Sequence, residues 1–144
     1  MKIHGKYLLS VGVLLLIANA VFVWPKHSSA LLLDCSTASS INVSTAECNA
    51  LIDLYNQTNG PSWMDSVNWD TDTDICTWEG VTCTNIGGFD HVTSLSLSGN
   101  NLNGVLPTSL TGLSYLTFLE LNENSLTGTL PASWATMTGL QKIN

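Results

Sequence analysis

Positive charge is scarce in this sequence of 144 residues, which has four lysines and no arginine. Three of those lysines precede residue 31, so Lys142 alone stands against all eleven acidic residues in the rest of the chain. One positive and eleven negative charges give residues 31–144 a net charge of −10. Because such a surface repels phosphate groups, we expect no nucleic-acid partner and no attraction to anionic membrane surfaces.

Residues that could perform catalysis are also scarce. His91 is the one histidine beyond residue 30, and no serine or cysteine nucleophile motif surrounds it. The acidic pair Glu120 and Glu123 lies in a predicted strand and turn, where a solvated face is the ordinary explanation and a glycosidase pair would need a pocket. The sequence also lacks a phosphate-binding glycine loop. We therefore expect neither an enzyme nor a cofactor.

Metal-binding patterns are incomplete. The cysteines form no Cys-x-x-Cys pair, and His91 is the one histidine available to join them, so a zinc site is not expected. Asp70-Thr71-Asp72-Thr73-Asp74 resembles the start of a calcium loop, but Ile75 and Val81 stand where such a loop needs glycine and glutamate. We interpret this stretch as a solvated acidic loop and expect no metal.

Residues 1–30 have the pattern of a targeting segment. Lys2 and Lys6 give a positive start, and residues 7–24 are uncharged and mostly apolar. Small residues then offer cleavage sites at Ala18-Asn19-Ala20 or Ser28-Ser29-Ala30. We favour a cleaved signal peptide. The alternative is an uncleaved membrane anchor, which with lysines on its amino side would also place residues 31–144 outside the cell.

The exported part contains all four cysteines, at positions 35, 48, 76 and 83. An even number of cysteines in an oxidising compartment predicts two disulfides. Four cysteines allow three connectivities, of which short loops favour Cys35–Cys48 and Cys76–Cys83.

Two N-glycosylation sequons begin at Asn42 and Asn56. Both lie in the exported part, before the repeats described below. Their placement agrees with secretion and would leave a binding face on the repeats clear of glycans.

A helix and a group of tryptophans are predicted in the first half of the exported part. Ser44-Thr45-Ala46-Glu47 matches a capping box, and apolar residues then recur at helical spacing until Asn59-Gly60-Pro61. Trp63 and Trp69 follow, and we interpret them as buried aromatics that cover the end of a solenoid. A carbohydrate-stacking platform is the alternative for these tryptophans.

Residues 92–144 repeat themselves at an offset of 24. Leu95, Leu97, Asn100, Leu102 and Gly104 fall on Leu119, Leu121, Asn124, Leu126 and Gly128, and Leu106-Pro107 falls on Leu130-Pro131. A third copy begins with Leu140 and Ile143. A fixed period with apolar, asparagine, glycine and proline positions in register predicts a solenoid, in which stacked copies bury one continuous core.

Two motifs carry a family resemblance. Leu95-x-Leu97-x-x-Asn100-x-Leu102-x-Gly104-x-Leu106-Pro107 resembles a plant-type leucine-rich repeat, as in receptor-kinase ectodomains, polygalacturonase-inhibiting proteins and secreted protist proteins. Cys76-x-Trp78-x-Gly80-Val81-x-Cys83 resembles the signature of the N-terminal cap of such proteins. The resemblance covers roughly residues 46–144 and gives Trp78 and Gly80 structural roles.

The predicted fold is therefore an α/β solenoid: a leucine-rich repeat protein with a disulfide-stapled N-terminal cap containing one helix, two full 24-residue repeats and the start of a third. The domains are a signal peptide or anchor at 1–30, the cap at 31–91 and truncated repeats at 92–144. Asn100 and Asn124 must turn inward, where a side-chain amide can satisfy backbone groups left unpaired by the turn.

The concave strand face is the surface expected to bind a partner. Ser94, Phe118 and Lys142 occupy one position in successive repeats, Ser96 and Glu120 the next, and Ser98 and Asn122 a third. A merely solvated sheet is the alternative, against which Phe118 argues because an exposed aromatic on a strand is a candidate anchor.

These features indicate a secreted or cell-surface module that binds a protein, peptide or glycan. The alternative is a truncated fragment of a larger leucine-rich repeat receptor or surface antigen with no independent activity, attached to a membrane through the anchor or a missing C-terminal part. Without a C-terminal cap, we expect Leu119, Leu121, Leu126 and Leu130 to lie near solvent and the chain to self-associate.

Overall fold

The computed structural model describes residues 33–36, 42–71 and 73–143. The predicted targeting segment lies outside these residues, so its cleavage and the domain boundary at residue 30 stay predictions. Within the described ranges, no helix is both long and apolar enough to cross a membrane.

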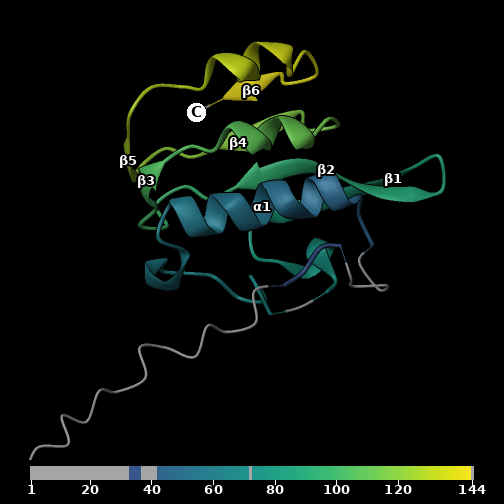
Figure 1. Cartoon of the computed structure of the whole chain (residues 1–144), viewed down its shortest axis with the longest axis horizontal. Helices are drawn as coiled ribbons and strands as arrows, with labels where there is room; N and C mark the ends of the chain where they lie inside the picture. Colours follow the sequence, from purple (N-terminus) through teal and green to yellow (C-terminus); the bar gives the residue numbers. More distant parts are fainter. Residues whose placement is uncertain (1–32, 37–41, 72, 144) are drawn as a thin grey trace, which may run out of the picture. The chain divides into compact units, whose positions relative to one another are not determined.

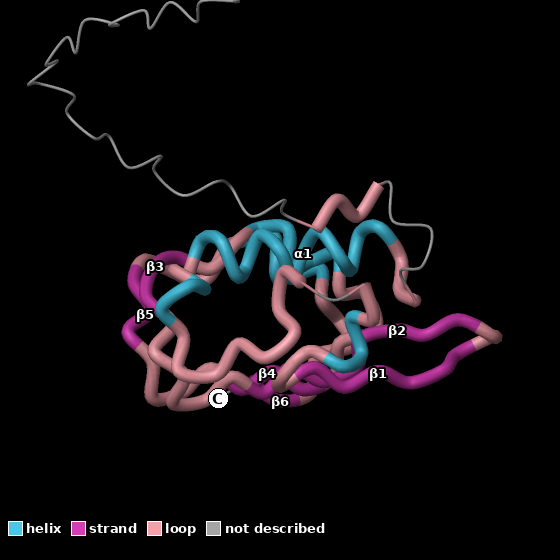
Figure 2. The backbone as a smooth tube through the Cα atoms, turned by 90° about the horizontal axis from the view of Figure 1, so that it is seen from below, coloured by secondary structure: helices cyan, strands magenta, loops and turns pink. Residues whose placement is uncertain are grey.

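The described residues form two layers (Figures 1 and 2). One layer is a four-stranded sheet in the order β1-β2-β4-β6, and a short second sheet pairs β3 with β5. The strands are β1 (Val81–Ile86), β2 (Phe89–Ser96), β3 (Asn103–Val105), β4 (Phe118–Glu120), β5 (Ser125–Thr127) and β6 (Lys142–Ile143). The other layer contains α1 (Thr45–Gln57) and the 3₁₀ helices η3 (Thr108–Gly112) and η4 (Ala132–Thr136), while η1 (Gly60–Ser62) and η2 (Ile75–Thr77) lie in the connections of the cap.

The register of the parallel strands confirms the sequence period. Leu95 of β2 pairs with Leu119 of β4, which pairs in turn with Ile143 of β6. Leu95 and Leu119 are fully buried between the two layers. Because successive side chains of a strand point to opposite faces, their neighbours in the sequence point away from this core.

Helix α1 begins where the capping box predicts. The Ser44 backbone N–H and hydroxyl both donate to a carboxylate oxygen of Glu47, at 3.0 and 2.7 Å, and the Glu47 N–H donates to the Ser44 hydroxyl at 3.3 Å. The second carboxylate oxygen of Glu47 accepts the N–H of Val92 in β2 at 3.0 Å. Glu47 is only 1% exposed, so one residue both caps the helix and joins the helix to the sheet.

The tryptophans of the cap are structural. Trp63, Trp69 and Trp78 are 7%, 2% and 1% exposed, and adjacent rings of this series lie 4.8 Å apart between centroids. Trp63 Nε1 donates to the Thr58 carbonyl at 3.0 Å, which satisfies its polar atom. Tyr55 stacks on Trp69, and burial and the charge of Asp70 raise the pKa of its phenol. Rings buried in this way cannot offer the carbohydrate-stacking platform considered above.

The disulfides join Cys35 to Cys48 and Cys76 to Cys83. This is the pairing that short loops favour. The first fastens the segment before α1 to the helix, and the second links η2 to β1.

The side chain of Asn124 turns inward and bonds to backbone groups, as predicted for the asparagines of the repeats. The Asn124 carboxamide oxygen accepts the backbone N–H groups of Asn100 and Leu102 at 3.0 and 2.9 Å. Its NH₂ group donates to the carbonyls of Leu97 and Leu121 at 2.7 and 2.9 Å. One amide thus satisfies backbone groups of two successive repeats, which is why a shorter or apolar side chain cannot replace it.

Two features differ from the sequence-based expectation. Leu119 and Leu121 are 0% and 7% exposed rather than near solvent, because β6 pairs with β4 and Trp134 closes over the core from η4. Leu126 is partly buried, and Leu130 is 59% exposed as expected.

The second difference is the antiparallel hairpin of β1 and β2, which the sequence did not predict. Its strands register from Val81 opposite Leu95 to Ile86 opposite Phe89, and Gly87 and Gly88 form its turn. The strand that starts the first repeat is therefore already paired with the cap.

Candidate ligand-binding face

The strand face is defined here as the side of the β1-β2-β4-β6 sheet that points away from the helices. The register stacks Ser94, Phe118 and Lys142 across β2, β4 and β6, and places Ser96 of β2 beside Glu120 of β4. This is the arrangement expected from the period of 24.

Phe118 is half-buried, and the Lys142 ammonium lies 4.9 Å from the centroid of its ring. That distance is within the range of a cation–π contact. On the neighbouring row, the Ser96 hydroxyl donates to the Glu120 carboxylate at 2.7 Å. The face therefore combines an aromatic ring, a carboxylate and hydroxyl groups.

The rim of the strand face continues past the ends of the strands. The Gly99 N–H donates to the Asn122 carbonyl at 3.0 Å, so the segments after β2 and β4 remain side by side. Ser98 and Asn122 are both exposed along this rim. The seven residues singled out from the sequence therefore lie along one continuous surface.

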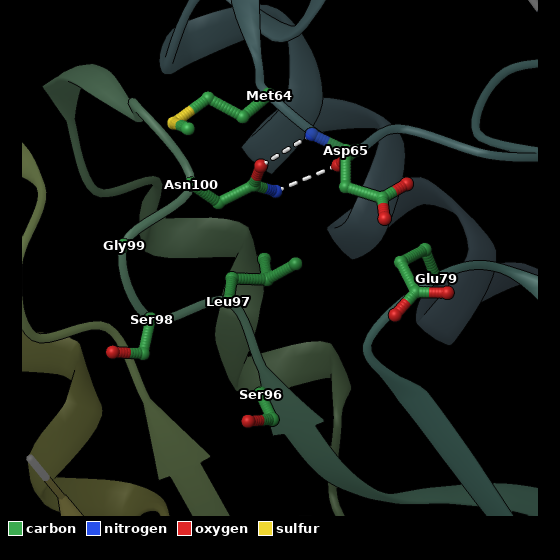
Figure 3. Close-up of a pocket in the computed structure, with 8 residues that line it drawn as sticks. All are labelled: Met64, Asp65, Glu79, Ser96, Leu97, Ser98, Gly99 and Asn100. Atoms are coloured by element: carbon green, nitrogen blue, oxygen red, sulfur yellow. Dashed lines mark hydrogen bonds between the residues drawn. The ribbon is translucent and has the colours of Figure 1, made fainter.

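A pocket of about 260 Å³ lies where this face meets the cap (Figure 3). Its lining comprises Met64, Asp65, Glu79, Ser96, Leu97, Ser98, Gly99 and Asn100. Sequence reasoning missed the first three, which come from loops of the cap. Their position depends on contacts between the cap and the first repeat, and no local pattern encodes those contacts.

A pair of short hydrogen bonds to Asn100 fixes the side of this pocket that the cap loop at Asp65 forms. The Asp65 N–H donates to the Asn100 carboxamide oxygen at 2.6 Å, and the Asn100 NH₂ donates to the Asp65 carbonyl at 2.7 Å (Figure 3). Asn100 is 6% exposed. Asn100 is thus structural, as expected, but its partners are in the cap rather than in its own turn.

A second pocket of about 400 Å³ lies at the other end of β2, beside the start of α1, and its lining comprises Asn42, Val43, Ser44, Phe89, Asp90 and His91. His91 packs on Tyr115 with ring centroids 3.9 Å apart, and its Nδ1 lies 3.4 Å from the Glu47 carboxylate. These two contacts place the His91 side chain at the junction of α1 and the sheet. His91 is the one histidine among the described residues, and its role here is structural.

Comparisons with known families agree with this architecture. A family model described as leucine rich repeat matches residues 90–144, and one described as leucine rich repeat N-terminal domain matches residues 44–84. The chain belongs to the leucine-rich repeat family. A search of curated proteins finds no significant match.

Several solved structures share the fold. A plant ice-binding protein superposes with a TM-score of 0.61 at 22% identity, covering 71% of this chain and 32% of that protein. The receptor kinase SOBIR1 ectodomain from Arabidopsis thaliana gives 0.56 at 21% identity, covering 72% and 53%. The PEPR1–AtPEP1 complex gives 0.56 at 21% identity, covering 69% and 14%. This leucine-rich repeat chain therefore spans between 14% and 53% of the length of these structures, and the likeness concerns the fold.

Gly80 of the cap signature has a clear structural reason in this leucine-rich repeat protein. Its φ is +79°, and a Cβ there would collide with the backbone oxygen of Ser96 at the end of β2. Only glycine allows the turn before β1 to approach β2 so closely. Trp78, two residues earlier, packs on Trp69 beneath this turn.

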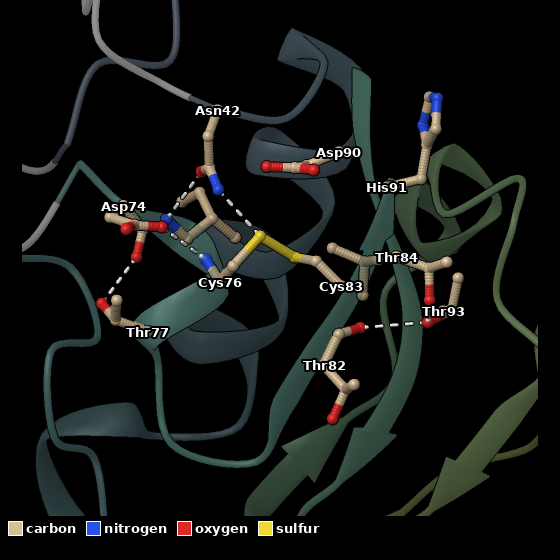
Figure 4. The surroundings of a disulfide bond; sticks show 12 residues. Asn42, Asp74, Cys76, Thr77, Thr82, Cys83, Thr84, Asp90, His91 and Thr93 are labelled. Carbon is tan, nitrogen blue, oxygen red and sulfur yellow. Dashed lines mark hydrogen bonds between the residues drawn. A yellow bond between two sulfur atoms is a disulfide. The ribbon is translucent and has the colours of Figure 1, made fainter. Parts of the chain in front are cut away.

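The two sequons of the leucine-rich repeat chain have different surroundings. Asn42 uses both ends of its amide, donating to Cys76 Sγ at 2.8 Å and accepting the Ile75 N–H at 3.1 Å (Figure 4). Asn56 is exposed near the end of α1, in the layer opposite the strand face.

The acidic loop also uses its carboxylates internally. Asp70 accepts the Leu33 N–H at 3.0 Å, and Asp74 accepts the Cys76 N–H at 3.2 Å. These bonds hold the loop against other parts of the cap, as in a structural turn.

Proposed function

We propose that this chain is a secreted or cell-surface binding module that recognises a protein, peptide or glycan through the strand face. A leucine-rich repeat fold suggests an interaction module, because stacked repeats present one side of their sheet to a partner. Two disulfides in the cap support an oxidising, extracellular compartment. We propose no enzymatic activity.

The observation that carries the proposal is the half-buried Phe118 in the centre of the sheet, among polar side chains of which Ser96 is exposed and Ser94 and Glu120 are partly buried. Aromatic residues surrounded by polar groups are common anchors of binding surfaces. The residues proposed to contact the ligand are Ser94, Ser96, Ser98, Phe118, Glu120, Asn122 and Lys142.

The test blocks the face without disturbing the core. The whole chain, secreted from eukaryotic cells, selects binders from a random decapeptide library, and the dissociation constants of those binders are then measured for two variants. Ser98→Arg places a long side chain on the strand face, and Ala135→Arg places the same side chain at an exposed position of η4. We expect S98R to abolish binding and A135R to preserve it. The opposite pattern would place the binding surface on the helix layer.

Phe118→Ala tests the anchor itself. We expect binding at least about tenfold weaker with a nearly unchanged melting temperature, since Phe118 is half-buried rather than part of the core. Unfolding of this variant would show that Phe118 is a core residue and would remove it from the site.

The second candidate is that the chain is part of a larger leucine-rich repeat receptor or surface antigen, where a further repeat would cover the edge at β6. The exposed fractions of Leu130 and Ile143, 59% and 50%, favour this candidate or self-association at the same edge. Sequencing of the full transcript distinguishes the two: in-phase repeats downstream support the larger protein, and a stop codon after Asn144 contradicts it.

A further inference from the structure

The strand face and the rim beside it are rich in negative charge. Asp65 and Glu79 line the pocket, Glu120 lies on the adjacent strand, and the Glu123 carboxylate is positioned 3.7 Å from where a Cβ on Gly99 would lie. Lys142 is the one lysine or arginine among the described residues. The charge of this surface is therefore complementary to a cationic partner and repels an acidic one.

The two carboxylates of the pocket extend from backbone that is held in place. The almost fully buried Asn100 side chain is hydrogen-bonded to both the N–H and the carbonyl of Asp65. The Glu79 N–H donates to the Val67 carbonyl at 3.1 Å, and the Glu79 carbonyl accepts from Trp69 Nε1 at 2.8 Å. A fixed backbone reduces the conformational entropy that these side chains lose when a ligand binds.

The same face already holds one cation. The Lys142 ammonium sits over the Phe118 ring in the row adjacent to Ser96 and Glu120. This contact belongs to the chain itself and does not depend on the acidic residues of the pocket. It shows that the centre of the strand face accommodates an ammonium group on a long aliphatic side chain.

From the charge, the held backbone and this internal contact, we infer that the strand face binds an extended basic peptide and that the pocket takes a lysine or arginine side chain. The inference rests on the proposed function, since it names the chemistry of the ligand of the same face. A volume of about 260 Å³ suits one side chain rather than a whole ligand. The rest of the peptide would lie along β2 and β4, over Phe118.

The experiment uses the whole secreted chain and the peptides enriched from the random decapeptide library. Each peptide is made with a fluorescent label, beside a version with glutamine at every lysine and arginine. Fluorescence polarisation gives the dissociation constants for the parent chain and for D65N/E79Q. The matched control D53N/D90N removes two negative charges from α1 and from the end of β2 away from the pocket.

We expect the enriched peptides to contain lysine or arginine and their glutamine versions to bind about tenfold more weakly. D65N/E79Q should weaken binding of the basic peptides about fivefold to tenfold, and D53N/D90N should change it by less than about twofold. Melting curves check that each variant is folded. E79Q alone, a change at an exposed side chain, should still weaken binding about twofold to threefold.

The outcomes separate this inference from the proposed function. Enriched peptides that lack basic residues, lose binding in S98R and bind D65N/E79Q normally would overturn the basic ligand but support the strand face. Enriched acidic peptides bound at this face would do the same. Peptides that bind S98R as well as the parent chain would overturn both, and the absence of any enriched peptide would overturn the basic peptide as the ligand.

Discussion

At the scale of single residues, asparagine side chains form hydrogen bonds that fix the backbone after the strand of each repeat. Asn124 bonds to backbone groups of both repeats, and Asn100 bonds to the cap loop at Asp65. The Asn124 amide reaches the proposed ligand-binding residues only at the Asn122 carbonyl, to which it donates at 3.2 Å, whereas Asn100 lines the pocket itself. The contribution of Asn124 should therefore appear in stability rather than in binding.

We predict that Asn124→Ala lowers the free energy of unfolding by about 1–3 kcal/mol, because it leaves backbone partners at Asn100, Leu102 and Leu97 unsatisfied. Asn122→Ala, at an exposed position two residues earlier, serves as the control and should change it by less than about 0.5 kcal/mol. Denaturant titration measures both. Equal effects of the two substitutions would mean that the amide of Asn124 has no special role.

The two sequons give a second prediction at this scale. An N-linked glycan needs a free amide nitrogen with space around it. The exposed Asn56 offers such a nitrogen, whereas the Asn42 amide is hydrogen-bonded to Cys76 and Ile75. Peptide mapping of the secreted chain should find a glycan on Asn56 and none on Asn42, and N56Q should remove the added mass. A glycan on Asn42 would show that the cap admits a different local structure.

At the scale of elements, the repeats and the helix were predictable because their signals are local or periodic. The capping box at Ser44 and the leucines at Leu95 and Leu119 each specify an element without reference to distant residues. The hairpin of β1 with β2 has a local signal in its Gly87-Gly88 turn, which the sequence reading did not use. The cap wall of the pocket depends instead on long-range contacts, such as Asn100 with Asp65. For the same reason, the acidic lining of the pocket could not be assigned from the sequence.

The hairpin supplies a matched test of close packing. Gly80 and Gly87 both have positive φ, 79° and 66°, but a Cβ on Gly80 would meet the Ser96 backbone whereas one on Gly87 has no atom within 4 Å. Gly87→Ala should cost about 1–2 kcal/mol of unfolding free energy from its backbone conformation. Gly80→Ala should cost a further amount of about 1–3 kcal/mol from the collision. Similar costs for both would argue against the close approach of the cap to β2.

At the scale of the whole molecule, the stack is closed at one end by the aromatic cap and presents β6 as a strand edge at the other. The buried Leu119 and Leu121 show that the short third strand already protects the core, contrary to the expectation from the sequence. What remains exposed at this end is Leu130 and Ile143. Self-association should therefore use the β6 edge and these two side chains rather than an open core.

We predict concentration-dependent self-association of the secreted chain at tens of micromolar, measured by sedimentation velocity, because an uncovered strand edge can pair with a second chain. L130K/I143K should shift the equilibrium to monomer. The matched control I86K/F89K changes two exposed apolar residues at the hairpin and should leave association unchanged. A parent chain that remains monomeric, or association lost in the control alone, would contradict the role of β6.

The central claim is that the strand face is the ligand-binding surface, and photo-cross-linking tests it most directly. A peptide enriched from the random library is made with a diazirine group, irradiated with the whole secreted chain, and its attachment points are located by mass spectrometry. The account predicts cross-links within residues 94–98 and 118–122 and in the cap loop at 64–65. Cross-links concentrated on α1, η3 or η4 would contradict it.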